Sequence, residues 1–317
     1  MTNPTRIPHL GRGVAHHTWD NTEPPQLFID PGEEVELELR DGSNGQITPS
    51  TIAAELHHLS QHLMDPLTGP IWVNGAVPGD AISVEILDIR LGAWGWSGIL
   101  PAFGLLADKF PDPFLRIWDT TADTVEIAPG HHFAIRPMLG VVGVAPREAG
   151  PHATTVPTTA GGNIDVKYAR AGSRILLPVF TEGALLSLGD THALQGDGEL
   201  NGTAIECEAD VRIRVKLHPG MGLEAPIIDT GVATDDPVER HRVFLGVGPD
   251  LHAAAKDAAL RATEGLADAL GIPAQEAYAL LGIIAELRIN EVVDKPNWVV
   301  GCLVPSRLFP DAYGRAV

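Results

Sequence analysis

The sequence of 317 residues has few cysteines, few basic side chains and no long hydrophobic run. Its two cysteines, Cys207 and Cys302, cannot form a disulfide framework, and both lie in apolar segments. We therefore expect buried thiols in a reducing compartment, the cytoplasm. Only 22 basic residues stand against 41 acidic ones, and the net charge of −19 opposes binding to nucleic acid or to anionic lipid. No segment has the length and apolarity needed to cross a bilayer, so we expect no membrane partner either.

Turn-forming residues and alternating strands, by contrast, are abundant. The 34 glycines and 26 prolines favour many short strands over long helices. Acidic and aliphatic residues alternate strictly over 34–39, and apolar and charged residues alternate over 205–217. This period of two is typical of antiparallel sheets with one buried face and one face in water. In the second segment we expect Glu206 and the other even-numbered residues to face solvent.

A repeated glycine spacing indicates two related β halves. Gly69 precedes Gly79 by ten residues, and Gly162 precedes Gly172 by the same interval. Each pair brackets a hairpin-like stretch that leads into a new apolar strand, because glycine supplies the positive φ of a tight turn. A duplicated β body would explain this spacing, and so would the chance reuse of common turns in a sandwich.

The last quarter of the sequence changes from strand to helix periodicity. Residues 250–270 carry Leu and Ala at helical spacing, Gly271 ends that helix and Pro273 begins another. A strand over 298–304 follows. The sequence thus predicts a mainly β protein with a small α+β part, in three segments: an N-terminal β domain (1–150) with an aromatic loop, a second β domain (151–225) that carries the site loop, and a C-terminal α+β portion (226–317).

Short motifs rich in Gly, Asp, His and Trp occur along the whole chain. They are HHTWDN (16–21), QITP (46–49), DPLTGP (65–70), PGD (78–80), WGW (94–96), GLLA (104–107), GGNID (161–165) and GDTHALQGDGE (189–199). In this order and spacing, the sequence resembles the acetamidase/formamidase family over essentially its entire length.

The resemblance implies both a fold and an activity. It implies β-sandwich, jelly-roll-like and barrel-like halves with a small helical portion, and an amidase that frees ammonia from formamide, acetamide or a related small amide. It also implies a divalent metal, zinc, and a homo-oligomer of two or more copies; some relatives hydrolyse γ-lactams. Two residues depart from the family pattern: Asp65 replaces an expected His, and Thr191 replaces an expected Gly. Both departures bear on substrate preference.

Amide hydrolysis requires an activated nucleophile, an acid for the departing amine and a group that polarises the carbonyl. Cys207 alternates with acidic residues in a strand pattern, which predicts a core thiol, and Cys302 lies in a terminal strand. The Gly-x-Ser-x-Gly motif of serine hydrolases is absent from the sequence. A metal-activated water remains as the nucleophile.

The segment 190–199 is the richest candidate site. Asp190 and His192 are two residues apart, so in a strand they share one face and offer ligands suited to zinc. Asp197 and Glu199 follow in a glycine-rich loop. Such a loop is equally typical of a solvated hairpin tip, but the resemblance is densest here and favours a site. We assign Asp190 and His192 as metal ligands, Glu199 as the proton carrier and Asp197 as an orienting group.

Further candidates lie elsewhere in the motifs. Asp165 follows two glycines, a context that suits either a third metal ligand or a turn, and His17 is a candidate ligand because only one of two adjacent histidines can face the site. We expect Gln195, Trp94 and Trp96 to contact substrate. The aromatic stretch that follows Trp94 could wall an apolar pocket, or pack to close one end of a sandwich.

Two other functions fit the same residues. A γ-lactam hydrolase would use the same site on a cyclic amide. A non-catalytic β domain that binds a small molecule would need no turnover at all, because a β fold alone does not fix a function.

Overall fold

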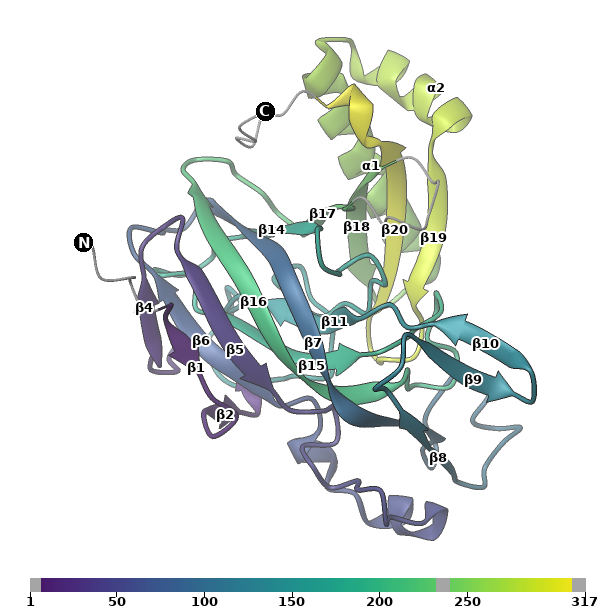
Figure 1. The fold of residues 1–317 in the computed structure, drawn as a ribbon. Coiled ribbons are helices and arrows are strands. Elements are labelled where there is room, and N and C mark those ends of the chain that lie inside the picture. Colours follow the sequence, from purple (N-terminus) through teal and green to yellow (C-terminus); the bar gives the residue numbers. More distant parts are fainter. Residues whose placement is uncertain (1–6, 232–239, 310–317) are drawn as a thin grey trace.

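The computed structural model describes residues 7–231 and 240–309 of the chain, and it is mostly β (Figure 1). The strands of its first half are β1 (His9–Leu10), β2 (Ala15–His16), β3 (Thr18–Trp19), β4 (Leu27–Ile29), β5 (Glu34–Leu39), β6 (Leu67–Val73), β7 (Ala81–Ile99), β8 (Phe114–Asp119), β9 (Thr124–Ala128), β10 (His131–Ala134), β11 (Met138–Gly143) and β12 (His152–Ala153). Those of its second half are β13 (Gly161–Asn163), β14 (Arg174–Pro178), β15 (Leu186–His192), β16 (Glu206–His218), β17 (Ile227–Asp229), β18 (His241–Gly248), β19 (Glu286–Glu291) and β20 (Trp298–Pro305).

Helices are few and mostly short. Two α-helices, α1 (Leu251–Leu270) and α2 (Ala274–Ile284), lie near the C-terminus, and three short 3₁₀ helices are η1 (Ala53–His58), η2 (Gln61–Leu63) and η3 (Ser306–Leu308). The predicted helix boundaries are confirmed, since Gly271 ends α1 with a φ of 64° and Pro273 precedes α2. None of the described helices combines the length and hydropathy required to cross a membrane.

One large mixed sheet organises the molecule. Its central strand order is β13-β11-β15-β16-β7-β14-β17-β18-β20-β19, and β1, β2 and β4 join it through β5 and β6, whereas β3 pairs with β12 in a separate two-stranded sheet. The long strands β16 and β7 pair antiparallel along the whole of β16. The predicted alternation is confirmed in β5, where Val35, Leu37 and Leu39 are at most 1% exposed. These side chains form the main hydrophobic core together with aliphatic residues of β7, β14 and β16.

The mainly β fold with a small helical part is confirmed. Helices α1 and α2 pack against β18 and β20, which Figure 1 shows at the C-terminal end of the molecule. They enclose a second hydrophobic cluster that contains Phe244, Ala258 and Leu281. Hydrogen-bonded strand pairs cross both expected domain boundaries: β14 pairs with β7 and with β17. The three-part division and the internal duplication stay predictions.

A buried ion-pair group joins β14, β17 and β18. Asp229 lies opposite Arg174 on one side and Arg242 on the other. Its Oδ2 accepts from Arg174 Nη2 at 2.5 Å, and its Oδ1 accepts from Arg242 Nε at 2.7 Å. Burial alone would raise the pKa of Asp229, but the two guanidinium groups outweigh it and the pKa is lowered.

We expect Asp229→Asn to lower the free energy of unfolding by about 3–5 kcal/mol, because it leaves two buried guanidinium groups without their counter-charge. Since the pKa of Asp229 is depressed in the folded chain, its contribution is complete at neutral pH and disappears as the pH falls below about 4. Urea unfolding at pH 7 and pH 3 measures both effects. Asp257→Asn, which removes only the helical Arg261–Asp257 pair, is the control and should cost about 0.5 kcal/mol or less. Equal losses in the two variants would contradict this account.

Candidate active site

Strand register brings the first chemically active side chains together. In the pairing of β15 with β16, His192 lies opposite Glu206. On the other side of β15, Met138 of β11 lies opposite His192, which places Gly140 of β11 beside the same side chains. Two residues before His192, Asp190 points to the same side of β15, as the strand period requires. The adjoining ends of three strands thus build one wall of a site.

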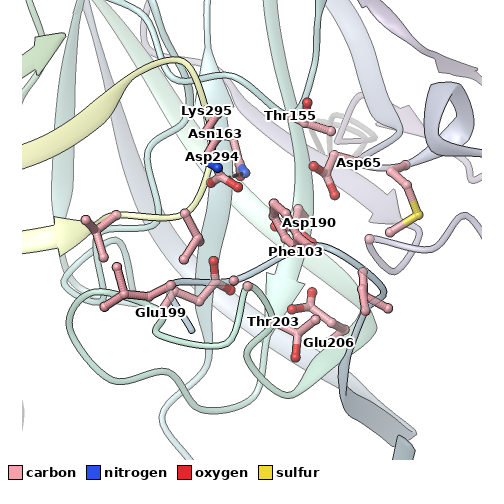
Figure 2. A pocket seen from close by; sticks show the side chains of 18 of the residues that line it. Asp65, Phe103, Thr155, Asn163, Asp190, Glu199, Thr203, Glu206, Asp294 and Lys295 are labelled. Carbon is pink, nitrogen blue, oxygen red and sulfur yellow. Dashed lines mark hydrogen bonds between the residues drawn. The ribbon is translucent and has the colours of Figure 1, made fainter. Parts of the chain in front are cut away.

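Carboxyl groups from four further segments converge on this wall, and Figure 2 labels three of them, Asp65, Glu199 and Asp294. Potential ligand atoms lie within 4.8 Å of one another in three overlapping groups: Asp165, Asp190 and His192; His192, Glu199 and Glu206; and Asp165, Glu199 and Asp294. Asp65, which precedes β6, lies close enough for the charges of Asp190 and Glu206 to raise its pKa further after burial has raised it. A dense group of buried acids therefore surrounds one imidazole.

Hydrogen bonds fix the orientation of that imidazole. Gln195 Nε2 donates to the backbone carbonyl of Asp165 at 2.7 Å, so its Oε1 is the acceptor that faces His192 Nδ1 at 2.8 Å. Burial alone would lower the pKa of His192, but the charges of Glu206 and Asp190 outweigh it and raise the pKa well above its ordinary value, so both ring nitrogens carry a proton among these acids. Nε2 donates to Asp190 Oδ2 at 3.0 Å and lies 3.0 Å from Glu206 Oε2, and a bound cation would take the place of its proton. A histidine held in this way by a second group is the usual form of a metal-ligating histidine.

Several carboxylate oxygens of the site lack protein partners. Both Oδ atoms of Asp165 and Oδ1 of Asp190 are buried without a hydrogen bond among the described residues. Burial and the charge of Asp190 raise the pKa of Asp165 to about 7 and that of Glu206 to about 8, against the opposing charge of His192. For Asp190 burial acts in the same sense, but the charge of His192 outweighs it and lowers the pKa. Uncompensated buried charge is costly, and a bound divalent cation removes that cost. The donor set fits such an ion.

Backbone geometry also marks these acids. Eight described non-glycine residues have positive φ, and four of them are site carboxylates: Asp65 at 47°, Asp165 at 44°, Asp190 at 47° and Glu199 at 45°. This region is sparsely populated by L-residues, and such conformations concentrate at functional sites. The four carboxylate residues thus have an unfavourable backbone conformation, which the surrounding sheet maintains.

Two glycines make room for the acids. A Cβ atom on Gly140 would lie 2.6 Å from Asp190 Oδ2 and 2.7 Å from Asp165 Oδ1. A Cβ atom on Gly42 would lie 2.6 Å from Asp190 Oδ1 and 3.2 Å from Asp65 Oδ1. Any larger residue at these positions would push the carboxylates apart.

The cluster opens into a cavity of about 550 Å³. Asp65, Asp190, Glu199, Glu206 and Asp294 line it, as Figure 2 shows. Its other lining side chains are largely apolar; they include Met64, Trp96, Leu100, Phe103, Leu105, Val292, Val293 and Trp298. A substrate in this cavity would have direct access to the acids.

The structure brings most of the sequence-predicted site residues together. The cluster contains four of them: Asp165 from the motif at 161–165, and Asp190, His192 and Glu199 from the motif at 189–199. Trp96 lines the cavity and donates from Nε1 to Asp41 Oδ2 at 2.8 Å.

Other predicted residues lie outside the cavity lining. Gln195 sits behind His192 and contacts it from the side opposite to Nε2. Trp94 packs at the edge of the hydrophobic cluster that contains Trp96. Asp197 forms ion pairs with Lys167 at 2.6 Å and with Arg288 at 3.6 Å.

His17 is likewise apart from the cluster of acids. None of the described groups of metal-ligating atoms includes it. Its pKa is lowered by burial and then by the charges of Arg40 and His62. The histidine therefore lies in a basic rather than an acidic environment.

One expectation from the strand pattern was wrong. Glu206 does not face solvent; it is 4% exposed and sits in the cluster. Glu206 is the first residue of β16, where both faces of the sheet are covered: Cys207 packs into an apolar cluster on one side, and the acids enclose Glu206 on the other. The alternation resumes at Glu208, which is exposed.

Sequence reasoning also missed two residues from distant segments. Asp294 follows β19 and accepts from Asn163 Nδ2 at 2.8 Å. Its only sequence signal is a lone acid after two valines, which gives no indication of a partner 131 residues away. Asp65 stood out only as a departure from a family pattern.

Comparisons with known proteins agree along the whole chain. A family model described as "Acetamidase/Formamidase family" matches residues 3–153 and 147–311. A formamidase from Methylophilus methylotrophus is 29% identical over 94% of this chain and 90% of its own length. An acetamidase from Mycolicibacterium smegmatis is 31% identical over 84% of this chain and 85% of its own length.

Solved structures give the same result. The crystal structure of an acetamidase from Bacillus halodurans has a TM-score of 0.86 and 29% identity, and covers 94% of this chain and 97% of that one. A γ-lactamase from Delftia acidovorans has a TM-score of 0.67 and 27% identity, and covers 95% and 92%.

We expect Gly140→Ala to weaken Zn²⁺ binding by about 10- to 100-fold, because the added methyl group displaces Asp190 and Asp165. Calorimetric titration of the metal-free protein with Zn²⁺ measures the effect, and circular dichroism checks that the fold is kept. Gly196→Ala is the matched control: it lies in the loop after His192, has no positive φ, and a Cβ there meets no atom within 4 Å. Equal affinity in Gly140→Ala and the unmodified protein would show that the carboxylates hold no ion.

Proposed function

The chain belongs to the acetamidase/formamidase family, and on this basis we propose that it is an amidase that hydrolyses a small linear amide to a carboxylate and ammonia. The observation that carries the proposal is the buried group of acids around His192, with unpaired oxygens that face a cavity. The formamidase and acetamidase relatives cover nearly the whole chain, so the proposal concerns the complete fold and not one shared segment.

We propose zinc as the metal, held by Asp165, Asp190 and His192. Mixed carboxylate and imidazole donors suit this ion, and Nε2 of His192, which faces Asp190 and Glu206, is the nitrogen that would bind it. When bound, such an ion polarises a carbonyl and lowers the pKa of water. Gln195 would act as a positioning residue, because it holds both the ring of His192 and the backbone of Asp165.

Glu199 is the proposed proton carrier. It lines the cavity, and burial followed by the charge of Asp165 raises its pKa well above the ordinary value. A carboxyl group whose pKa is raised takes up and releases its proton closer to neutral pH than an ordinary glutamate does. Glu199 would take a proton from the attacking water and give it to the nitrogen that leaves. Asp197 would orient this loop through its ion pairs with Lys167 and Arg288.

A γ-lactam hydrolase is the second candidate. The similarity to the Delftia acidovorans γ-lactamase favours it, although the TM-score of 0.67 is lower than that of the acetamidase. A cyclic amide offers the same C–N bond to the same residues. A purely binding β domain is the third, and it would have no use for a buried acid with a raised pKa beside the cavity.

The setting of the enzyme is also a proposal. We propose a cytoplasmic homo-oligomer that binds neither nucleic acid nor membranes, in line with its net charge of −19 and its two buried free thiols. A neutral amide would approach this acidic molecule without electrostatic opposition.

We expect Glu199→Gln to lower kcat for acetamide by about 10²- to 10⁴-fold, since the amide side chain cannot carry the proton. Ammonia release measures turnover. Glu224→Gln changes an exposed acid outside the site and serves as the control. Unchanged turnover in Glu199→Gln would remove Glu199 from the mechanism.

Removal of the metal tests the other half of the proposal. We expect dialysis against a chelator to abolish ammonia release from formamide and acetamide, and added Zn²⁺ to restore it. Ring opening of a γ-lactam, followed in parallel, separates the second candidate from the first. Full activity in protein that elemental analysis shows to be free of metal would contradict the metal assignment.

A further inference from the structure

The cavity is much larger than formamide or acetamide. Acetamide has four non-hydrogen atoms and fills on the order of 100 Å³ if each heavy atom takes about the volume of a water molecule, ~30 Å³. The cavity measures about 550 Å³. Cavities of roughly 300–1,000 Å³ are typical of sites for ligands of drug size. A short amide would leave most of this space filled with water.

The surplus space is bordered by an apolar wall that is already packed. Met64, Trp96 and Leu100 are at most 8% exposed and form one hydrophobic cluster with Ile47 and Leu56 behind them. Phe103 packs against this cluster from the cavity side. The wall is therefore part of a folded core and does not depend on a ligand for its shape.

The same wall is attached to the turn that carries Glu199. Leu105 N donates to Leu200 O at 2.9 Å. A Cβ atom on Gly202 would lie 2.4 Å from the ring of Phe103, so the loop packs directly on the glycine of that turn. These contacts hold the apolar surface against the turn that carries the proposed proton carrier; Figure 2 labels Phe103 and Glu199 among the residues that line the cavity.

Exposure and charge indicate what the wall would receive. Leu105 lines the cavity yet is 50% exposed, so a ligand would bury apolar surface there. Acids crowd the inner end, and the single cationic residue in the described lining is Lys295, which is exposed. An anionic substrate is thus disfavoured, and a neutral one with an apolar body fits.

We infer that the preferred substrates are neutral primary amides with a large apolar acyl group, such as an aryl-substituted or branched alkyl group. This inference rests on the proposed amidase function and names its substrate class. The acyl group would lie on Trp96, Leu100 and Phe103, with the carbonyl at the acids. Water adds its oxygen to the carbonyl carbon, the C–N bond breaks, and the nitrogen takes up protons and leaves as ammonia beside an apolar carboxylate.

The test measures kcat/KM of the full-length, zinc-loaded protein for formamide, acetamide and phenylacetamide. Ammonia release is the readout. We expect phenylacetamide to exceed acetamide by roughly 10- to 100-fold, because the ring is buried on the wall. Hydrolysis of acetamide with a phenylacetamide-to-acetamide ratio of one or less would overturn the inference and leave the amidase proposal in place. No ammonia from any of the three amides would overturn the amidase proposal, and the inference with it.

Two variants locate the effect in the cavity. Leu105→Trp narrows the mouth and should lower the phenylacetamide-to-acetamide ratio at least fivefold. Leu106→Trp is the matched control: it is the next residue and 53% exposed, but it does not line the cavity, so the ratio should not change. The same ratio in Leu105→Trp as in the unmodified protein would also overturn the inference. Both residues are exposed, so neither change disturbs the core.

Discussion

The repulsion among buried carboxylates is the constraint on which the rest of this molecule depends. Asp165, Asp190, Glu199, Glu206 and Asp294 would not stay together in a low-dielectric interior unless positive charge were supplied. His192 supplies part of it, and its ring is aimed by Gln195. The remaining charge must come from protons or from a cation, and a divalent cation bound among these acids would meet this requirement. The electrostatic cost of the acid cluster and the proposed metal binding thus have one physical origin, the mutual repulsion of the carboxylates.

The large sheet supplies the rigidity that this arrangement requires. Each acid is carried at the end of a strand or in a tight loop beside one, and several adopt a positive φ that an isolated peptide would avoid. The long pairing of β16 with β7 and the core beneath it fix these ends. Residues far apart in sequence, such as Asn163 and Asp294, are then brought within hydrogen-bond distance. The favourable free energy of folding of the sheet compensates for the unfavourable free energy of holding these acids together.

Local patterns predicted much of the fold but only part of the site. Two short-range signals are confirmed by the structure. One is the alternation in β5 and β16, and the other is the glycine that ends α1 and the proline that precedes α2. The resemblance to the acetamidase/formamidase family is confirmed as well. Asp190 and His192 could be associated from their spacing alone. Asp294 could not, because its position depends on strand order across the sheet, and Glu206 looked solvent-facing because the pattern of a strand does not show what covers its end.

The C-terminal α+β portion contributes residues to the site, although it lies far along the chain from the other site residues. The loop after β19 carries Asp294 and contributes Val292 and Val293 to the cavity, while Gly198 beside Glu199 hydrogen-bonds to Asn290 of β19. Six of the residues that line the cavity therefore belong to the C-terminal portion, whose own core is built on α1 and α2: Leu251, Val292, Val293, Asp294, Lys295 and Trp298. A change in how those helices pack would therefore shift Val292 and Val293, which shape the cavity, together with Asp294, so the shape of the cavity and the arrangement of its acids are mechanically linked.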